Sequence, residues 1–114
     1  AGRPAPAPLA PASRPAPAEI TAAVIQRVIG GGGRAFRACY ERELLDQPAL
    51  AVRLVLAFTI APDGSVTGAR VESGAGNARL ESCLLRALER LAFPPPSDGQ
   101  PVTVSFPFQF QPAR

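Results

Sequence analysis

The sequence contains no histidine and no lysine, so all 12 of its basic residues are arginines. Histidine and lysine supply the usual general bases and activated amines of enzymes, and histidine is the usual nitrogen ligand of zinc. The two cysteines, Cys39 and Cys83, are too few for a zinc site and lack the spacing of a redox motif. We therefore expect a non-catalytic protein without a metal or a cofactor.

The acidic residues offer no second route to catalysis. On the predicted helices and strands they face solvent, where a hydrated charge is the ordinary role; these are Glu41, Glu43, Asp46, Glu72 and Glu81. Asp63 and Asp98 lie beside glycines and are predicted to be turn residues.

Long apolar runs and basic clusters are also missing. No stretch approaches the ~20 apolar residues of a membrane-spanning helix. The net charge of +3 comes from arginines scattered along the chain. A nucleic-acid footprint would be a clustered basic patch with interleaved aromatics, so we expect no nucleic-acid partner.

Residues 1–18 are rich in proline and alanine and have one larger apolar residue, Leu9. Such a segment buries too little surface to offset its ordering entropy, so we predict a disordered linker with extended polyproline character. It is either a passive connection or a spacer that reaches across a gap. Because the sequence begins abruptly within it, we expect a piece of a longer, anchored protein, whose folded domain spans residues 19–112.

Helical periodicity begins near Glu19, with apolar residues at Ile20, Val24 and Val28. Gly30–Gly33 should end or hinge this helix, because each glycine costs ~0.5–1 kcal/mol relative to alanine in a helix. A second helix is predicted over residues 34–45. Its Tyr40 is interpreted as a core residue with its hydroxyl at the surface, or alternatively as a contact residue.

Alternating apolar residues predict strands over residues 52–60, 65–73 and 102–110. Pro62-Asp63-Gly64 is a turn signal between the first two, and a change of parity near Gly68 indicates a bulge. A third helix is predicted over residues 78–91, with Asn77 as its N-cap.

These elements predict an α+β domain in which helices cover one face of a three-stranded antiparallel sheet. Residues 52–60 form the most apolar strand and should be central, which gives the order 2-1-3. Pro107 supports an edge position for the last strand, because proline is largely confined to edge strands and bulges.

The two cysteines allow either one disulfide in an oxidising compartment or two buried thiols. In the predicted fold, the second and third helices lie on the same face of the sheet, with Cys39 and Cys83 on their inward flanks. This arrangement favours a disulfide, which closes a loop of about 45 residues and contributes roughly 4 kcal/mol in the chain-entropy model.

Several short segments, taken in order, resemble a known family. They are Cys39-Tyr40-Glu41, Phe58-Thr59-Ile60, Asp63-Gly64, Val66 to Ser73, Cys83, Phe93-Pro94 and Phe106-Pro107-Phe108. Over residues 20–112 the chain resembles the carboxy-terminal domain of TonB-type energy transducers, in particular the AgmX/PglI-type proteins of myxobacteria, some of which belong to gliding-motility machinery. It departs from the family in Gly30–Gly33, where a charged helix is expected.

The resemblance implies a periplasmic domain whose parent is anchored in the inner membrane and driven by a proton-powered motor complex. The domain would bind an outer-membrane or periplasmic protein by adding an extended peptide to its last strand. The strand comprises Val102, Thr103, Val104, Ser105, Phe106, Pro107, Phe108, Gln109 and Phe110. Self-association of two copies through the same strand is the alternative, which would make this a structural domain of an envelope complex.

Overall fold

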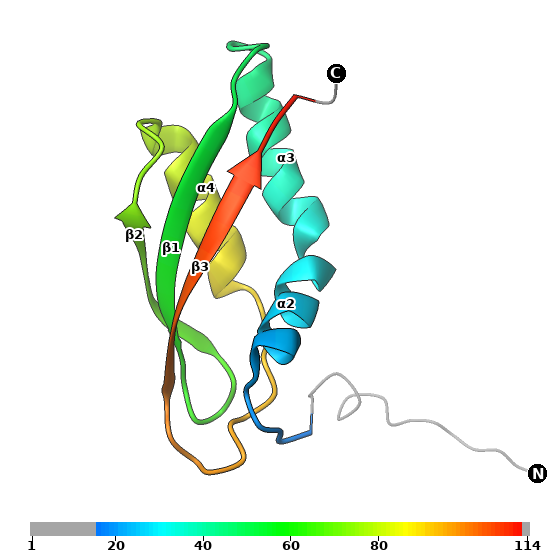
Figure 1. Cartoon of the computed structure of the whole chain (residues 1–114), viewed down its shortest axis with the longest axis vertical. Coiled ribbons are helices and arrows are strands. Elements are labelled where there is room, and N and C mark those ends of the chain that lie inside the picture. The colour runs from blue at the N-terminus through cyan, green and yellow to red at the C-terminus, as the bar shows by residue number, and fades with distance from the viewer. Residues whose placement is uncertain (1–15, 113–114) are drawn as a thin grey trace, which may run out of the picture.

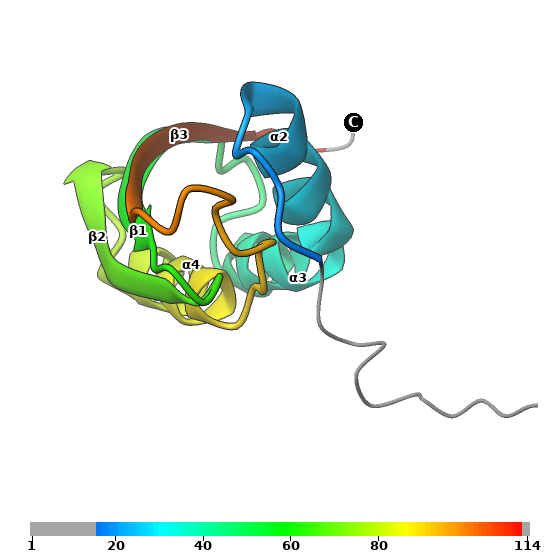
Figure 2. The ribbon, with the colours of Figure 1, turned by 90° about the horizontal axis from the view of Figure 1, so that it is seen from below.

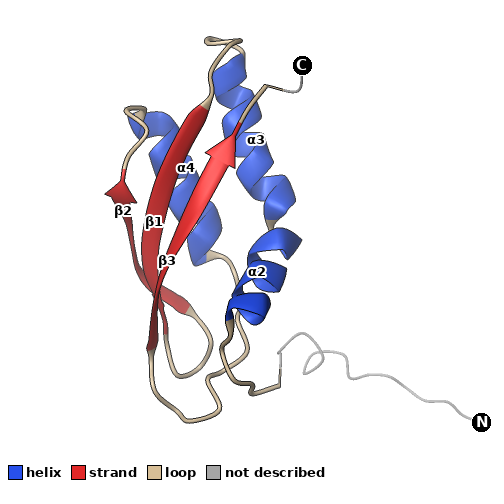
Figure 3. Cartoon of the chain, viewed as in Figure 1, coloured by secondary structure: helices blue, strands red, loops and turns tan. Residues whose placement is uncertain are grey.

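The structure of the protein is a computed structural model that describes residues 16–112. Within that range, three helices and three strands follow the predicted order (Figures 1 and 3). Their bounds are α2 Ala22–Gly31, α3 Gly33–Leu44, β1 Val52–Ile60, β2 Val66–Ser73, α4 Ala78–Glu89 and β3 Val102–Phe110. The first helix begins later than the sequence pattern indicates, because the side chain of Thr21 caps it by accepting a hydrogen bond from the Val24 amide at 3.2 Å.

The sheet is antiparallel and has the order β2-β1-β3, which confirms the predicted fold class. The central strand turns one face wholly into the core, where Leu54, Leu56, Phe58 and Ile60 are fully buried. Burying each such side chain stabilises the fold by ~1.5–3 kcal/mol relative to leaving it exposed. β1 is therefore the strand on which the other two assemble.

The β1–β2 hairpin contains the predicted turn and bulge. Gly64 has a φ of 90°, and a Cβ on it would lie 2.1 Å from the carbonyl oxygen of Phe93, so both the backbone angle and the space require glycine. The pairing register shifts between Ala57 and Thr59, opposite the segment that holds Gly68 with a φ of 62°. The bulge near Gly68 is thus confirmed.

Two helices cover one face of the curved sheet, and the third stands at its side. In the view from below, α3 and α4 lie against the sheet and α2 stands beside β3 (Figure 2). The predicted break between the first two helices is confirmed, since the helical path is interrupted at Gly32. A Cβ on Gly32 would approach Leu91 Cδ2 to 2.7 Å, whereas Gly30, Gly31 and Gly33 have no such neighbour.

The chain enters the fold at Ala18. Its amide donates to the carbonyl of Pro95 at 3.0 Å, and its carbonyl accepts from the amide of Ser97 at 3.0 Å. These bonds form an isolated parallel bridge just before β3 begins. Of the predicted linker over residues 1–18, residues 1–15 lie outside the described residues.

Aromatic contacts join α3 to β3 through the core. Phe36 packs against Phe108, and Tyr40 stacks on Phe110, each with ring centroids 5.1 Å apart. Tyr40 is 1% exposed, and its hydroxyl donates to the carbonyl of Leu50 at 2.5 Å. The core role of Tyr40 is confirmed, but the hydroxyl is buried and bonded rather than placed at the surface.

A disulfide links α3 to α4. It joins Cys39 and Cys83, whose Cα atoms are 5.7 Å apart, and leaves no free cysteine in the chain. The predicted disulfide is therefore confirmed. The cross-link ties together the two helices that cover the sheet.

Candidate functional site

The last strand presents one side of its backbone to the outside. β3 pairs with β1 over its full length, from Val102 opposite Ile60 to Phe110 opposite Val52. Its other side has no strand partner in the part of the chain that the structure describes. Val104 and Phe108 are buried, whereas the odd-numbered residues of β3 are exposed. A backbone edge of this kind is a template for another extended chain.

The position of Pro107 indicates which backbone groups are free. The β1–β3 register passes through Val55 opposite Pro107 without a shift, as expected when the proline nitrogen faces away from β1. In an antiparallel strand, alternate residues direct their amide and carbonyl groups to the same side. Thr103, Ser105 and Gln109 then direct their amides to the free edge, and Pro107 leaves a gap in that row of donors.

A groove runs between this edge and α2. It has a volume of about 230 Å³ and is lined by Ala22, Ile25, Gln26, Val104, Ser105, Phe106 and Pro107. If another strand paired with β3, the side chains on its α2-facing side would point into this groove, beside Ile25 and Phe106. Residues of α2 were not predicted to belong to the site, and only the i+4 spacing of its apolar residues indicated a packing face.

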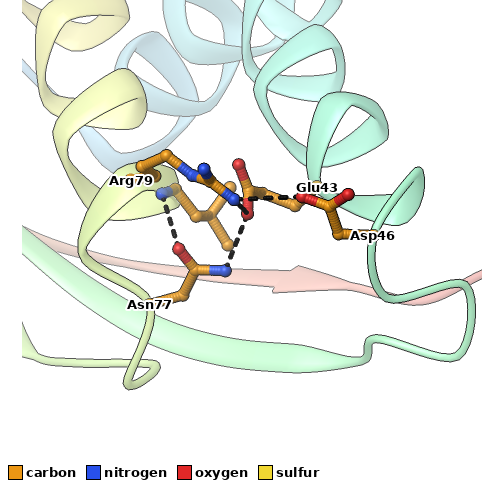
Figure 4. A network of polar contacts seen from close by, with 5 residues as sticks. Glu43, Asp46, Asn77 and Arg79 are labelled. Atoms are coloured by element: carbon orange, nitrogen blue, oxygen red, sulfur yellow. Dashed lines mark hydrogen bonds and ion pairs between the residues drawn. The ribbon is translucent and has the colours of Figure 1, made fainter.

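A polar network at the other end of the helices is structural in character (Figure 4). Glu43 Oε1 accepts from Asn77 Nδ2 at 3.1 Å and from an Arg79 guanidinium nitrogen at 3.3 Å. Arg79 also pairs with Asp46 at 3.2 Å, and the Asn77 side chain caps α4 by accepting from the Leu80 amide at 3.0 Å. The network fastens the end of α3 to the start of α4.

The prediction that Glu43 faces solvent is wrong. The residue is 4% exposed, because it lies at the junction of α3 and α4, where the cap of α4 covers it. The hydrogen bond from Asn77, with further help from Arg79, lowers the pKa of Glu43 despite its burial. The same contact with Glu43 raises the pKa of Arg79.

Four other acidic residues that were predicted to be solvent-facing or turn residues each accept a hydrogen bond. Glu81 is half-buried and accepts from the Ala75 amide at 2.7 Å. Asp63 accepts from the amide of Ser65 and Asp98 from that of Gln100, each at 3.0 Å, so both are turn residues as predicted. Exposed Glu72 accepts from the Ser105 hydroxyl at 2.6 Å.

Two classes of feature are absent from residues 16–112. No group of three or more histidine, cysteine, aspartate or glutamate side chains is placed to hold a metal ion. None of the helices described is long and apolar enough to cross a membrane.

The fold is that of a small α+β domain with one unpaired strand edge among the described residues. The family profile of the Gram-negative bacterial TonB protein C-terminal matches residues 48–112, which is more than half of the chain. The protein belongs to this family.

Other comparisons add little to the family assignment. None of the curated proteins matches the chain. The solution structure of the TonB C-terminal domain of Helicobacter pylori is similar, with 21% sequence identity and a TM-score of 0.49. The similarity covers 82% of this chain and 95% of that domain.

Proposed function

We propose that this domain is a non-catalytic, force-transmitting binding module of the periplasm, which holds an extended peptide at the free edge of β3. The peptide belongs to an outer-membrane or periplasmic protein. The parent is anchored in the inner membrane, and a proton-powered motor complex drives it. Family membership supports the envelope location.

The observation that carries this proposal is the unpaired side of β3 beside the groove. Main-chain bonds to Thr103, Ser105 and Gln109 would supply affinity, and side chains of the peptide that enter the groove would supply specificity. Apolar residues at alternate positions of the peptide fit the walls formed by Ile25 and Phe106. Because Pro107 has no amide hydrogen, registers in which no peptide carbonyl lies opposite its nitrogen are favoured.

The path of the chain suits the transmission of force. The chain enters at Ala18, at the end of the molecule where β3 begins, and β3 runs from there toward the opposite end (Figure 1). A pull on Ala18 that is directed away from the opposite end of the molecule is then nearly parallel to β3. It loads the ladder bonds of an added strand together rather than one after another.

The resemblance to AgmX/PglI-type proteins supports gliding motility as the process served, with transport as the other envelope process of this class. Residues 1–18 then act as the spacer that reaches across the periplasm, and residues 19–112 as the domain that binds the partner.

The test compares two substitutions at one exposed position. Ser105→Pro removes an amide from the free edge, whereas Ser105→Ala keeps that amide, and both lose the hydroxyl that donates to Glu72. A photo-crosslinking amino acid replaces Gln109 in the full-length parent, in living cells. We expect crosslinks to an extended segment of an envelope protein when residue 105 is serine or alanine. With Ser105→Pro, the crosslink yield should be at least tenfold lower. Equal yields from the two variants would refute strand addition at this edge.

Self-association through β3 is the second candidate, because an unpaired edge can equally accept a second copy of itself. Sedimentation of the isolated chain over a wide concentration range distinguishes the two. A monomer–dimer equilibrium that Ser105→Pro abolishes and Ser105→Ala retains would favour the dimer. A monomer at all concentrations would leave the edge for another protein.

A further inference from the structure

A second groove lies between α3 and α4, on the outer side of the two helices. It has a volume of about 250 Å³ and is lined by Ala35, Ala38, Cys39, Arg42, Cys83, Arg86, Ala87 and Arg90. Small side chains and the disulfide form its floor, and the three exposed arginines form its rim. We call it the arginine groove. Arg42 of α3 lies 44 or more positions before Arg86 and Arg90 of the α4 segment. The antiparallel packing of the two helices places all three along one groove.

Within residues 16–112, none of the rim arginines forms an ion pair, and only the charge of Arg42 acts on a carboxylate, that of Glu43. None of the described residues that line the arginine groove carries a carboxylate side chain. Two of the nearby acids have other partners, since Glu41 pairs with Arg37 and Glu43 with Arg79. Glu89 precedes Arg90 on α4 and forms no ion pair with it among residues 16–112. Within residues 16–112, no carboxylate lies at ion-pair distance from the rim arginines. Arg86 donates to the Ser82 hydroxyl at 3.0 Å and to no other side chain among the described residues.

We propose that the arginine groove binds the phosphate headgroups of an anionic membrane surface. A guanidinium offers a planar fork of donors that matches phosphate oxygens, and arginine is less strongly hydrated than lysine. The alanine floor lets a headgroup approach between the helices. Three such forks around one shallow hollow fit several negative groups, as a lipid surface presents them.

The composition of this face favours a lipid surface over a protein. Protein interfaces are centred on buried aromatic or large apolar anchors with a polar rim. The arginine groove has no such anchor, because its apolar atoms are those of alanines and the disulfide. The large apolar residues of both helices, such as Phe36, Leu84 and Leu88, face the sheet and are buried. The groove therefore offers mainly positive charge for recognition, and positive charge is sufficient for binding to a layer of anionic headgroups.

The arginine groove is separate from the proposed peptide edge at β3. The arginine groove is built from α3 and α4, whereas the peptide edge is built from β3 and α2, and the two share no residue. Membrane contact and peptide binding can therefore occur together. A domain held at a membrane surface would diffuse along that surface until it meets a partner protein located there.

The test uses the whole chain and two variants of equal charge. The first, Arg42→Gln with Arg86→Gln and Arg90→Gln, removes the rim. The second, Arg27→Gln with Arg53→Gln and Arg70→Gln, removes three exposed arginines outside the arginine groove. Each variant lowers the net charge from +3 to zero. Because all six arginines are exposed, both variants should keep the thermal midpoint within a few degrees.

The measured quantity is the partition coefficient onto phosphatidylglycerol-containing vesicles at low salt, with phosphatidylcholine vesicles as the uncharged reference. Each arginine near an anionic surface contributes about fivefold, so the rim variant should bind roughly a hundredfold more weakly. The control variant should lose less than tenfold. Equal losses would show that net charge alone acts, and absence of binding by the unchanged chain would also overturn the proposal. Rim-dependent binding of polyglutamate without vesicle binding would assign the groove to an acidic protein instead.

Discussion

The cross-link between Cys39 and Cys83 should account for a large share of the stability of this domain. The two residues are separated by 44 positions. In the chain-entropy model, closing a loop of that length stabilises the fold by about 4 kcal/mol. Small domains have a total free energy of unfolding of ~5–15 kcal/mol, so reduction should remove between about a quarter and four fifths of it.

The assay is urea unfolding of the oxidised and the reduced chain, followed by circular dichroism. Reduction changes no side chain except the two sulfurs, so it isolates the cross-link better than substitution does. With a urea dependence of ~1–2 kcal/mol per molar, the midpoint should fall by roughly 2–4 M on reduction. Cys39→Ala with Cys83→Ala serves as a second comparison that does not require a reductant.

A small effect would refute this reasoning. If reduction lowers the free energy of unfolding by less than about 1 kcal/mol, the unfolded chain already holds the two helices close together, and the loop-entropy estimate does not apply. An intermediate unfolding phase in the reduced chain alone would instead show that α3 separates before the sheet opens.

Three further changes test local contacts. Alanine at Gly30 or Gly33 meets no atom within 4 Å, and neither residue has a positive φ, so each substitution should raise the thermal midpoint by a few degrees. Tyr40→Phe leaves the Leu50 carbonyl without its donor and should cost ~1–2 kcal/mol in urea unfolding. The pKa of Glu43 is lowered in the folded state, so its contribution to stability is complete above the ordinary glutamate pKa of 4.5 and is lost as the pH falls through the lower folded value. Unfolding of Glu43→Gln should lack that part of the acid dependence.

Local patterns in the sequence predicted the elements of this fold well. The alternation of Val104, Phe106 and Phe108 with polar residues specifies a half-buried strand without reference to the rest of the chain. Asn77 caps α4 as predicted, because a side-chain oxygen at that position satisfies an amide only three residues away. The central place of β1 followed from its apolar composition, since a strand covered by helices and flanked on both sides needs few polar groups.

Among contacts distant in the sequence, the disulfide and the strand order were predicted, whereas the surroundings of Glu43 and the arginine groove were not. Glu43 is an ordinary polar residue on a helix until Asn77 and Arg79, more than 30 positions away, cover it. The rim arginines appear scattered in the sequence, and the pairing of α3 with α4 gathers them. Arg86 lies one turn after Cys83, so the predicted disulfide already contained a hint of this arrangement.

The disulfide also determines which parts of the chain would feel a pull. Tension applied at Ala18 first meets two backbone hydrogen bonds, those to Pro95 and Ser97. Beyond them, the segment from Ala18 to Cys39, which holds α2 and the start of α3, can unravel to an extended length of about 70 Å, at ~3.3–3.6 Å per residue. At Cys39 the force crosses to Cys83 and continues through α4 toward β3, so the covalent path bypasses the intervening β1–β2 hairpin. Early extension of the domain would then end at the disulfide. Force–extension curves of the oxidised and reduced chain should differ in the length at which this early extension ends.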